Sequence, residues 1–233
     1  SPHAALACVS CHQDLDGKEL PHPARLATVD CAACHAAEHT QYAESVHGQV
    51  AARGEKLAPG CKECHGRHDV VAASDQRSPT HIVNVPALCG RCHHEGSPVQ
   101  IKYHIPQDSI LANYSESIHG EGLYRRALTV TAVCTSCHTA HHVLPHPDPR
   151  SSIARRNVAA TCTQCHNVEQ SCDSCHSRHL FDAKQARAPV SCATCHMGPD
   201  HAQWEMYSTS KHGVLNATRG EQVGPSCAGC HMP

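Results

Sequence analysis

The sequence repeats one five-residue motif, Cys-x-x-Cys-His, nine times, and the nine copies contain all 18 cysteines of the 233-residue chain. Two cysteines three positions apart, followed at once by a histidine, are typical of covalent haem attachment. The two thiols bond to one porphyrin, and the adjacent histidine binds its iron from the proximal side. We therefore expect nine covalently attached haem c groups, and a fold that depends on them.

The nine motifs define the proximal half of each expected site. The cysteines expected to hold the porphyrins are Cys8, Cys11, Cys31, Cys34, Cys61, Cys64, Cys89, Cys92, Cys134, Cys137, Cys162, Cys165, Cys172, Cys175, Cys192, Cys195, Cys227 and Cys230. The expected proximal ligands are His12, His35, His65, His93, His138, His166, His176, His196 and His231.

Other uses of paired cysteines fit this pattern poorly. A zinc site needs four ligands and has no need of a histidine after every second cysteine. A disulfide framework does not repeat one local spacing nine times. A thioredoxin-like motif occurs once, beside a βαβ pattern.

The chain is poor in the side chains that normally build a core. Leu, Ile, Val and Phe make up 36 of 233 residues, below the roughly 20% typical of a chain that folds unaided. Nine apolar porphyrins can supply the missing core. We therefore expect the chain without haem to be unfolded, as small metal-dependent domains are without their metal.

Charge and hydropathy limit the partners. The net charge is −2, and the chain has one Trp and one Phe and no basic block, so nucleic-acid binding is not expected. No run of 18 apolar residues is present, so no transmembrane segment is expected. Haem attachment outside the cytoplasm implies export with removal of a signal peptide, and hence a periplasmic or extracellular location.

An internal repeat organises the first two thirds of the chain. A shift of 73 residues places Cys61–His93 on Cys134–His166 without a gap, as in proteins that stack similar units. We expect three haem modules in one continuous body, at residues 1–93, 94–166 and 167–233. They hold haems 1–4, 5–6 and 7–9.

The expected fold is mostly irregular, with short α-helices wrapped around a contiguous haem array and little or no β-sheet. Pro and Gly punctuate the chain, and helices are expected at Ala36–His47, Asp108–Arg126 and Asp200–His212. Each overlaps one copy of the unit Tyr-x-x-Ser-x-His-Gly, which occurs at residues 42–48, 114–120 and 207–213. We interpret its glycine as the left-handed C′ residue that ends the helix.

The chain has 24 histidines, so 15 remain after the nine proximal ones. Three lie in the Tyr-x-x-Ser-x-His-Gly units, and three follow a motif as Cys-His-x-x-His, too close to reach their own haem. Nine distal ligands are expected, enough to make every iron bis-histidine: His3, His22, His47, His68, His119, His141, His179, His201 and His212. His39, His104 and His142 are the nearest substitutes.

Two stretches resemble known families. CATCHMGPDHAQWEMYSTSKHG, at residues 192–213, resembles the octahaem hydroxylamine oxidoreductase family, which implies distal ligation by His201 and His212. Residues 1–166 resemble tetrahaem and cytochrome c3-like multihaem proteins, which implies the same for His22, His47 and His68. The hydroxylamine oxidoreductases keep one iron open, whereas the ligand count here leaves none, so we expect no enzymatic activity.

Electron transfer is the expected function, in one of two forms. Subunits could assemble into an extracellular conductive filament, or the protein could be a soluble periplasmic carrier. The expected partners are other redox proteins or further copies of the chain, met through exposed terminal haems, with His3 completing a haem of the next copy. The remaining alternative is an oxidoreductase acting on a small nitrogen or sulfur compound.

Overall fold

The computed structural model of the chain describes residues 1–18, 21, 25–107, 109–166, 176, 177, 179–198 and 202–232. Over these ranges the regular structure is entirely helical, without strand or sheet, which confirms the expected fold class. The longest helices contain nine residues. Isolated helices shorter than about 12 residues are marginal in water, so these helices depend on what packs against them.

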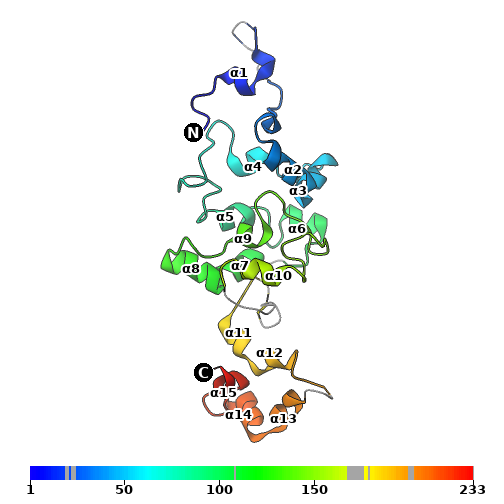
Figure 1. The fold of residues 1–233 in the computed structure, drawn as a ribbon, viewed down its shortest axis with the longest axis vertical. Coiled ribbons are helices and arrows are strands. Elements are labelled where there is room, and N and C mark those ends of the chain that lie inside the picture. Colours follow the sequence, from blue (N-terminus) through cyan, green and yellow to red (C-terminus); the bar gives the residue numbers. More distant parts are fainter. Residues whose placement is uncertain are drawn as a thin grey trace. The chain divides into compact units, whose positions relative to one another are not determined.

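The helices follow one another with irregular segments between them (Figure 1). The α-helices are α1 Cys8–Cys11, α2 Ala36–Glu44, α3 Val46–Ala52, α4 Cys61–His65, α5 Val85–Gly90, α6 Pro98–Tyr103, α7 Ile110–Glu116, α8 Ile118–Arg126, α9 Cys134–His138, α10 Val158–Cys162, α11 Ala183–Arg187, α12 Pro189–Ala193, α13 Gln203–Thr209, α14 Lys211–Arg219 and α15 Cys227–His231. Two 3-10 turns, η1 Gln13–Leu15 and η2 Cys31–Ala33, complete the set.

The backbone forms two compact units, and each draws on two stretches of chain. The first unit contains residues 1–108 and 132–157, and the second contains residues 109–131 and 158–233. These boundaries differ from those of the three modules expected from the haem motifs. The three modules remain a prediction about how the haems group.

The 73-residue repeat is visible in the hydrogen bonds of the first unit. The Asn84 side chain donates to the carbonyl of Ser78 at 2.8 Å, and Asn157 donates to the carbonyl of Ser151 at 2.8 Å. Both serines are buried. The two copies therefore share their local fold as well as their sequence.

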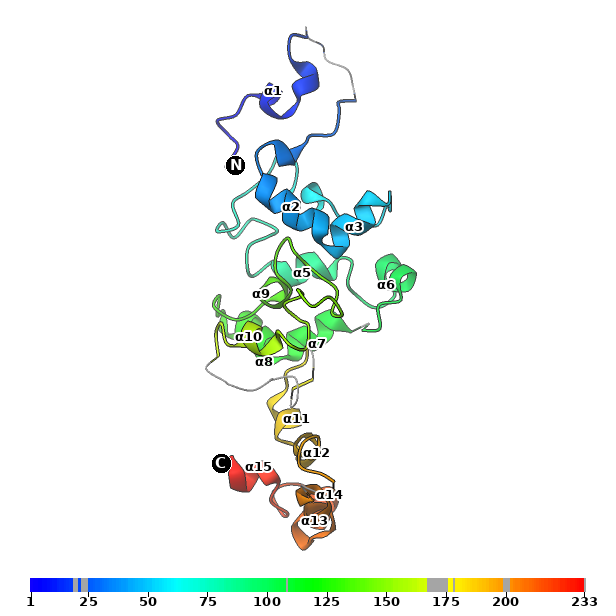
Figure 2. The same ribbon diagram turned by 45° about the vertical axis from the view of Figure 1, so that its right-hand side comes forward.

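Each of the three expected long helices is a pair of helices. Ser45 separates α2 from α3, Ser117 separates α7 from α8, and Ser210 separates α13 from α14. Figure 2 shows α2 continuing into α3 in the first unit and α13 continuing into α14 in the second. Each serine has extended backbone and caps the second helix, which explains the break.

The expected role of the glycine in this unit is wrong. Gly48, Gly120 and Gly213 lie in the first turn of the second helix, and none has a positive φ. A Cβ atom on any of them would lie 2.0 Å from the carbonyl oxygen of the tyrosine six residues earlier. Glycine is required here because the two helices approach closely, and the histidine projects from the start of a helix.

The apolar core is as small as the composition predicts. The buried apolar residues of the described ranges are Val85, Tyr114, Leu123, Val133, Leu144, Ala154, Ala193 and Ala228. The chain exposes 15909 Å², compared with about 10,000 Å² for a compact protein of this size. The excess is surface that nine haems can cover.

Candidate haem centres

Each described motif forms a single helical turn. In α4, α9 and α15 the five residues are the helix itself. In five others the histidine N–H donates to the carbonyl of the first cysteine at 2.9–3.0 Å. Residues i, i+3 and i+4 share one face of a helix, so both thiols and the imidazole face the same side. Cys172 and Cys175 lie outside the described residues.

Five proximal histidines face an expected distal histidine, with ring centroids 6.0–6.2 Å apart. The pairs are His12 with His68, His35 with His3, His65 with His141, His93 with His47, and His166 with His119. The structure therefore brings together ten of the expected ligands in five pairs of rings.

The separation of the ring centroids matches that of two imidazoles that bind one metal ion between them. Metal–imidazole bonds are about 2 Å long, and two such bonds plus the radii of two five-membered rings account for the observed separation. The residues fit the group.

The electrostatics of these pairs favour coordination. Burial lowers the pKa of His47, His65, His93 and His119, since it disfavours the imidazolium form. A second histidine nearby lowers the pKa of His47 and His65 further. The neutral ring that results has the free lone pair that a metal requires.

The pairs link motifs that are not consecutive in the chain. His68 follows the third motif and faces His12 of the first, and His141 follows the fifth and faces His65 of the third. This supports the expectation that Cys-His-x-x-His histidines serve a haem other than their own.

The helix-borne histidines follow a second rule. His47 precedes the third motif and faces His93 of the fourth, and His119 precedes the fifth and faces His166 of the sixth. In both cases the partner belongs to the second motif after the Tyr-x-x-Ser-x-His-Gly unit. His3 lies before the first motif and likewise faces the second, at His35 of its own chain, so the expected ligation of a neighbouring copy has no support.

Four expected distal ligands remain. His22 and His201 lie outside the described residues. His179 is half-buried with a φ of 66°. His212 is exposed, and none of the described residues lies against its ring.

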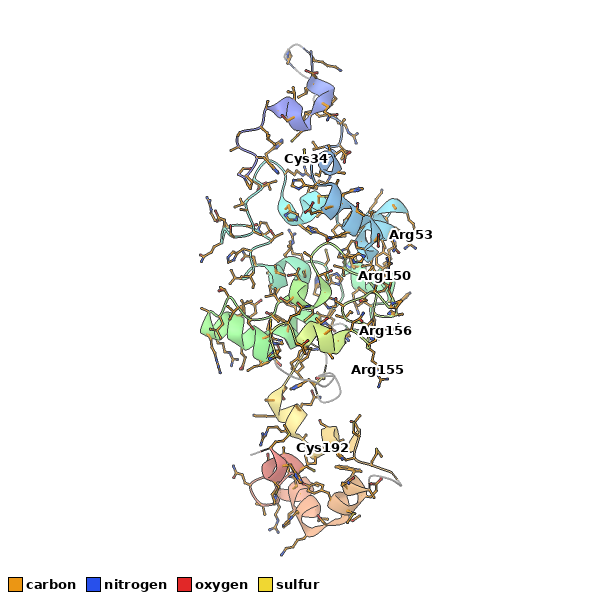
Figure 3. All side chains as sticks on the ribbon, viewed as in Figure 1. Cys34, Arg53, Arg150, Arg155, Arg156 and Cys192 are labelled. Atoms are coloured by element: carbon orange, nitrogen blue, oxygen red, sulfur yellow. The ribbon has the colours of Figure 1, made fainter. Side chains whose placement is uncertain are left out.

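The first cysteines of consecutive motifs meet in three places, which the sequence did not reveal. Cys89 lies close enough to Cys134 to perturb its pKa, and the same holds for Cys61 beside Cys31 and for Cys227 beside Cys192. Figure 3 labels Cys192 near α15, the helix that carries Cys227. The hydrogen bond with Cys134, followed by burial, raises the pKa of Cys89. Haems 2 and 3, 4 and 5, and 8 and 9 therefore have adjoining attachment points.

Phe181 is a second feature that the sequence analysis missed. The ring centroid of this residue, the chain's single phenylalanine, lies 5.5 Å from that of His119 and 6.0 Å from that of His176. It thus contacts the expected distal ligand of haem 6 and the proximal ligand of haem 7. Its position in sequence, two residues after His179, gave no signal of this contact.

Several of the remaining histidines have protein partners. His142 Nε2 lies 3.2 Å from a carboxylate oxygen of Glu44, and Arg150 donates to the same oxygen at 2.7 Å. His94 Nδ1 lies 2.9 Å from the carbonyl oxygen of Gly90. These contacts are those of structural residues, and they make His142 a poor substitute ligand.

Arginines lie along one side of the first unit. Figure 3 labels Arg53, Arg150, Arg155 and Arg156 on that side. Arg155 and Arg156 are exposed, and neither forms an ion pair within the described part of the chain. Guanidinium groups bind carboxylates strongly, so these two are available to haem propionates.

Within the described ranges, no helix combines the length and the apolar character that crossing a bilayer requires.

Comparison with known proteins places the motifs among multihaem cytochromes. Residues 150–224 match the family model described as "Seven times multi-haem cytochrome CxxCH". The multihaem cytochrome MtrA of Shewanella baltica is 24% identical over an alignment that covers 99% of this chain and 78% of that protein.

A further relative corrects one expectation. A probable nitrite reductase–hydroxylamine oxidoreductase fusion protein of Kuenenia stuttgartiensis is 41% identical over an 87-residue alignment that covers 30% of this chain. The chain spans only 10% of that relative's length. A relative named for two enzymes contradicts the expectation that the protein is no enzyme. The ligand count behind that expectation assumed nine distal histidines, and His212 and His231 have no ring partner among the described residues.

Proposed function

Since the chain is a multihaem c-type cytochrome, we propose that it carries nine haems and transfers electrons along them. Each haem, when bound, supplies a one-electron centre whose potential depends on axial ligands, burial and hydrogen bonding. The observation that carries the proposal is the set of five histidine pairs with ring centroids 6.0–6.2 Å apart. Two imidazoles per iron leave no position for substrate, as a transfer centre requires.

The pairing of a histidine beside one motif with the proximal histidine of another supports electron transfer over several haems. His68 and His141 each belong to the loop of one haem and face the proximal histidine of another, so neighbouring haems are held at fixed spacing. The meeting of first cysteines, as at Cys89 and Cys134, brings further haem edges together. His22, His179 and His201 remain proposed distal ligands for three of the other haems.

The proposed setting is the periplasm or the cell exterior, with other redox proteins as donor and acceptor. The similarity to MtrA over nearly the whole chain favours this setting. Assembly of copies into a conductive filament is the alternative arrangement of the same function. Electron microscopy of the purified holoprotein distinguishes the two, because a filament and a discrete particle are directly visible.

The test of the proposal combines a count of electrons with spectroscopy. Intact mass should give nine haems, reductive titration should take up nine electrons, and paramagnetic resonance of the oxidised protein should be dominated by low-spin ferric signals. Fewer than five low-spin irons would contradict the assignment of the histidine pairs.

A second candidate function is oxidoreductase chemistry at an iron with an open axial position. It is favoured by His231, which is exposed and has no ring partner among the described residues. The names of the enzymes fused in the Kuenenia relative make nitrite and hydroxylamine the first ligands to test. A high-spin ferric signal that either compound abolishes supports this candidate, and nine low-spin irons exclude it.

A further inference from the structure

Phe181 lies between ligands of two different haems. Its ring centroid is 5.5 Å from that of His119 and 6.0 Å from that of His176, with ring planes inclined by 56° and 38°. Aromatic rings at these separations are in contact. Burial lowers the pKa of His119, and His166 and His176 lower it further, as expected for histidines that lie near one another. All of these residues belong to the second compact unit.

The backbone at Phe181 has an unusual conformation. Its φ is 43°, in the left-handed region that bulky side chains rarely occupy. The Phe181 N–H donates to the carbonyl of Ser177 at 3.0 Å, and the next residue, Asp182, caps α11 by accepting from the N–H of Lys184 at 3.0 Å. Strained backbone persists only where its surroundings enforce it, and it is frequent at functional sites. The placement of this phenyl ring therefore requires a reason.

The imidazole of His119 supplies that reason, because hydrogen bonds fix its backbone alone. The Gly120 N–H donates to the Ser117 hydroxyl at 3.0 Å, and the Thr131 hydroxyl donates to the carbonyl of His119 at 3.1 Å. An imidazole held only in this way can still rotate about its bond to iron. Among the described residues, the aromatic ring that lies beside it, apart from the facing His166, is that of Phe181. Phe181 therefore restricts this rotation.

We propose that Phe181 is a positioning residue that sets the ring orientations of His119 and His176 and thereby tunes haems 6 and 7 together. The orientation of axial imidazoles sets the d-orbital energies of an iron, and an apolar neighbour keeps water away from the ligands. Both effects change the potential of a haem. One phenyl ring in contact with a ligand of each haem links the two potentials. The inference rests on the proposed haem array.

The test compares Phe181→Ala and Phe181→Tyr with the wild-type holoprotein. Paramagnetic resonance of the oxidised protein reports imidazole orientation through the g-values of each low-spin iron, and a redox titration gives the potentials. Phe181→Ala should shift the g-values of two irons, because their ligands can turn. It should also lower both potentials, because the water that enters favours the more charged ferric state. Phe181→Tyr keeps an aromatic ring in place and should restore the wild-type g-values.

Two further variants assign the signals and control for the loss of an aromatic ring. His119→Ala should remove one low-spin signal, that of haem 6, and this signal should be one of the two that Phe181→Ala shifts. Tyr103→Ala is the matched control. Tyr103 is exposed and lies beside the ammonium group of Lys102, 5.6 Å from its ring centroid, so this variant should keep the wild-type g-values and potentials.

Two results would overturn the inference. One is unchanged g-values and potentials in Phe181→Ala. The other is an equal shift in Phe181→Ala and Phe181→Tyr, which would assign the effect to the strained turn instead of the ring. If Phe181→Ala loses haem, Phe181→Leu, which keeps the bulk without a planar ring, should give the same shift in g-values. Loss of a low-spin signal in His119→Ala supports the haem array whatever Phe181 does, so failure of this inference is distinguishable from failure of the proposed function.

Discussion

Two adjacent histidines, His141 and His142, have different surroundings. The ring of His141 faces that of His65, whereas His142 contacts the carboxylate of Glu44. Substitutions at these two adjacent positions therefore distinguish the loss of a haem ligand from the loss of a histidine that binds no haem.

We expect His141→Ala to remove the distal ligand of haem 3. One iron of nine should become high-spin, and the potential of haem 5, whose loop carries His141, should shift as well. His142→Ala should leave all spin states unchanged. Paramagnetic resonance and a redox titration measure both effects, and equal spectra for the two variants would contradict the pairing with His65.

The carboxylate of Glu44 gives a prediction about pH. Hydrogen bonds from His142 and then from Arg150 hold the pKa of Glu44 below its usual value. A carboxylate whose pKa is lower in the folded state stabilises the fold above its unfolded pKa of about 4.3, and this contribution is lost as the pH falls through the folded pKa. Glu44→Gln should therefore lower Tm at neutral pH, with the difference from wild type shrinking below about pH 4.

Thermal melts of wild type, Glu44→Gln and Glu116→Gln across this pH range provide the measurement. Glu116 is exposed at the end of α7 and forms no ion pair among the described residues, so its variant should follow the wild type. A difference between wild type and Glu44→Gln that does not change with pH would refute the assigned role of the carboxylate.

At the scale of elements, the helix pairs depend on a single glycine each. Gly48→Ala would place a Cβ atom 2.0 Å from the carbonyl oxygen of Tyr42, and backbone must move to relieve the clash. Overpacking of this kind costs about 1–3 kcal/mol or more. Denaturant unfolding of the holoprotein should show a loss in the upper part of that range, with an altered spectrum for haem 4, since His47 precedes the glycine.

Gly60→Ala is the matched control for this prediction. A Cβ atom at Gly60 would meet only the end of the Glu63 side chain, at 3.3 Å, and Gly60 has a negative φ. Its free energy of unfolding should change little. Equal losses for the two variants would mean that the close approach of α2 and α3 is not what requires glycine.

The sequence predicted the local turn of each motif better than it predicted the helices. The turn in each motif is local, and the short tether of His68 to its own haem already excluded that haem as its partner. The serine three residues before Gly48 was the available signal for an N-cap, but the same glycine also fits a helix C-terminus. The contact of Cys89 with Cys134 depends on two distant segments packing together, and no local pattern encodes it.

At the scale of the whole molecule, the haems are expected to hold the fold. The small set of buried apolar residues and the 15909 Å² of exposed surface leave little to stabilise the chain alone. Protein expressed without haem attachment should therefore have an unfolded circular dichroism spectrum and rapid proteolysis, whereas the holoprotein should be helical and resistant. A cooperative thermal transition in the haem-free chain would contradict this expectation.

The meeting of cysteines from consecutive motifs has a consequence for biosynthesis. Neighbouring thiols in an oxidising compartment are prone to form disulfides, and a bond between Cys89 and Cys134 would remove one attachment point from each of two porphyrins. Attachment must therefore come before compaction, while the two segments are still apart. The order of assembly is then built into the fold, and a chain that collapses early leaves two porphyrins with a single thioether bond each.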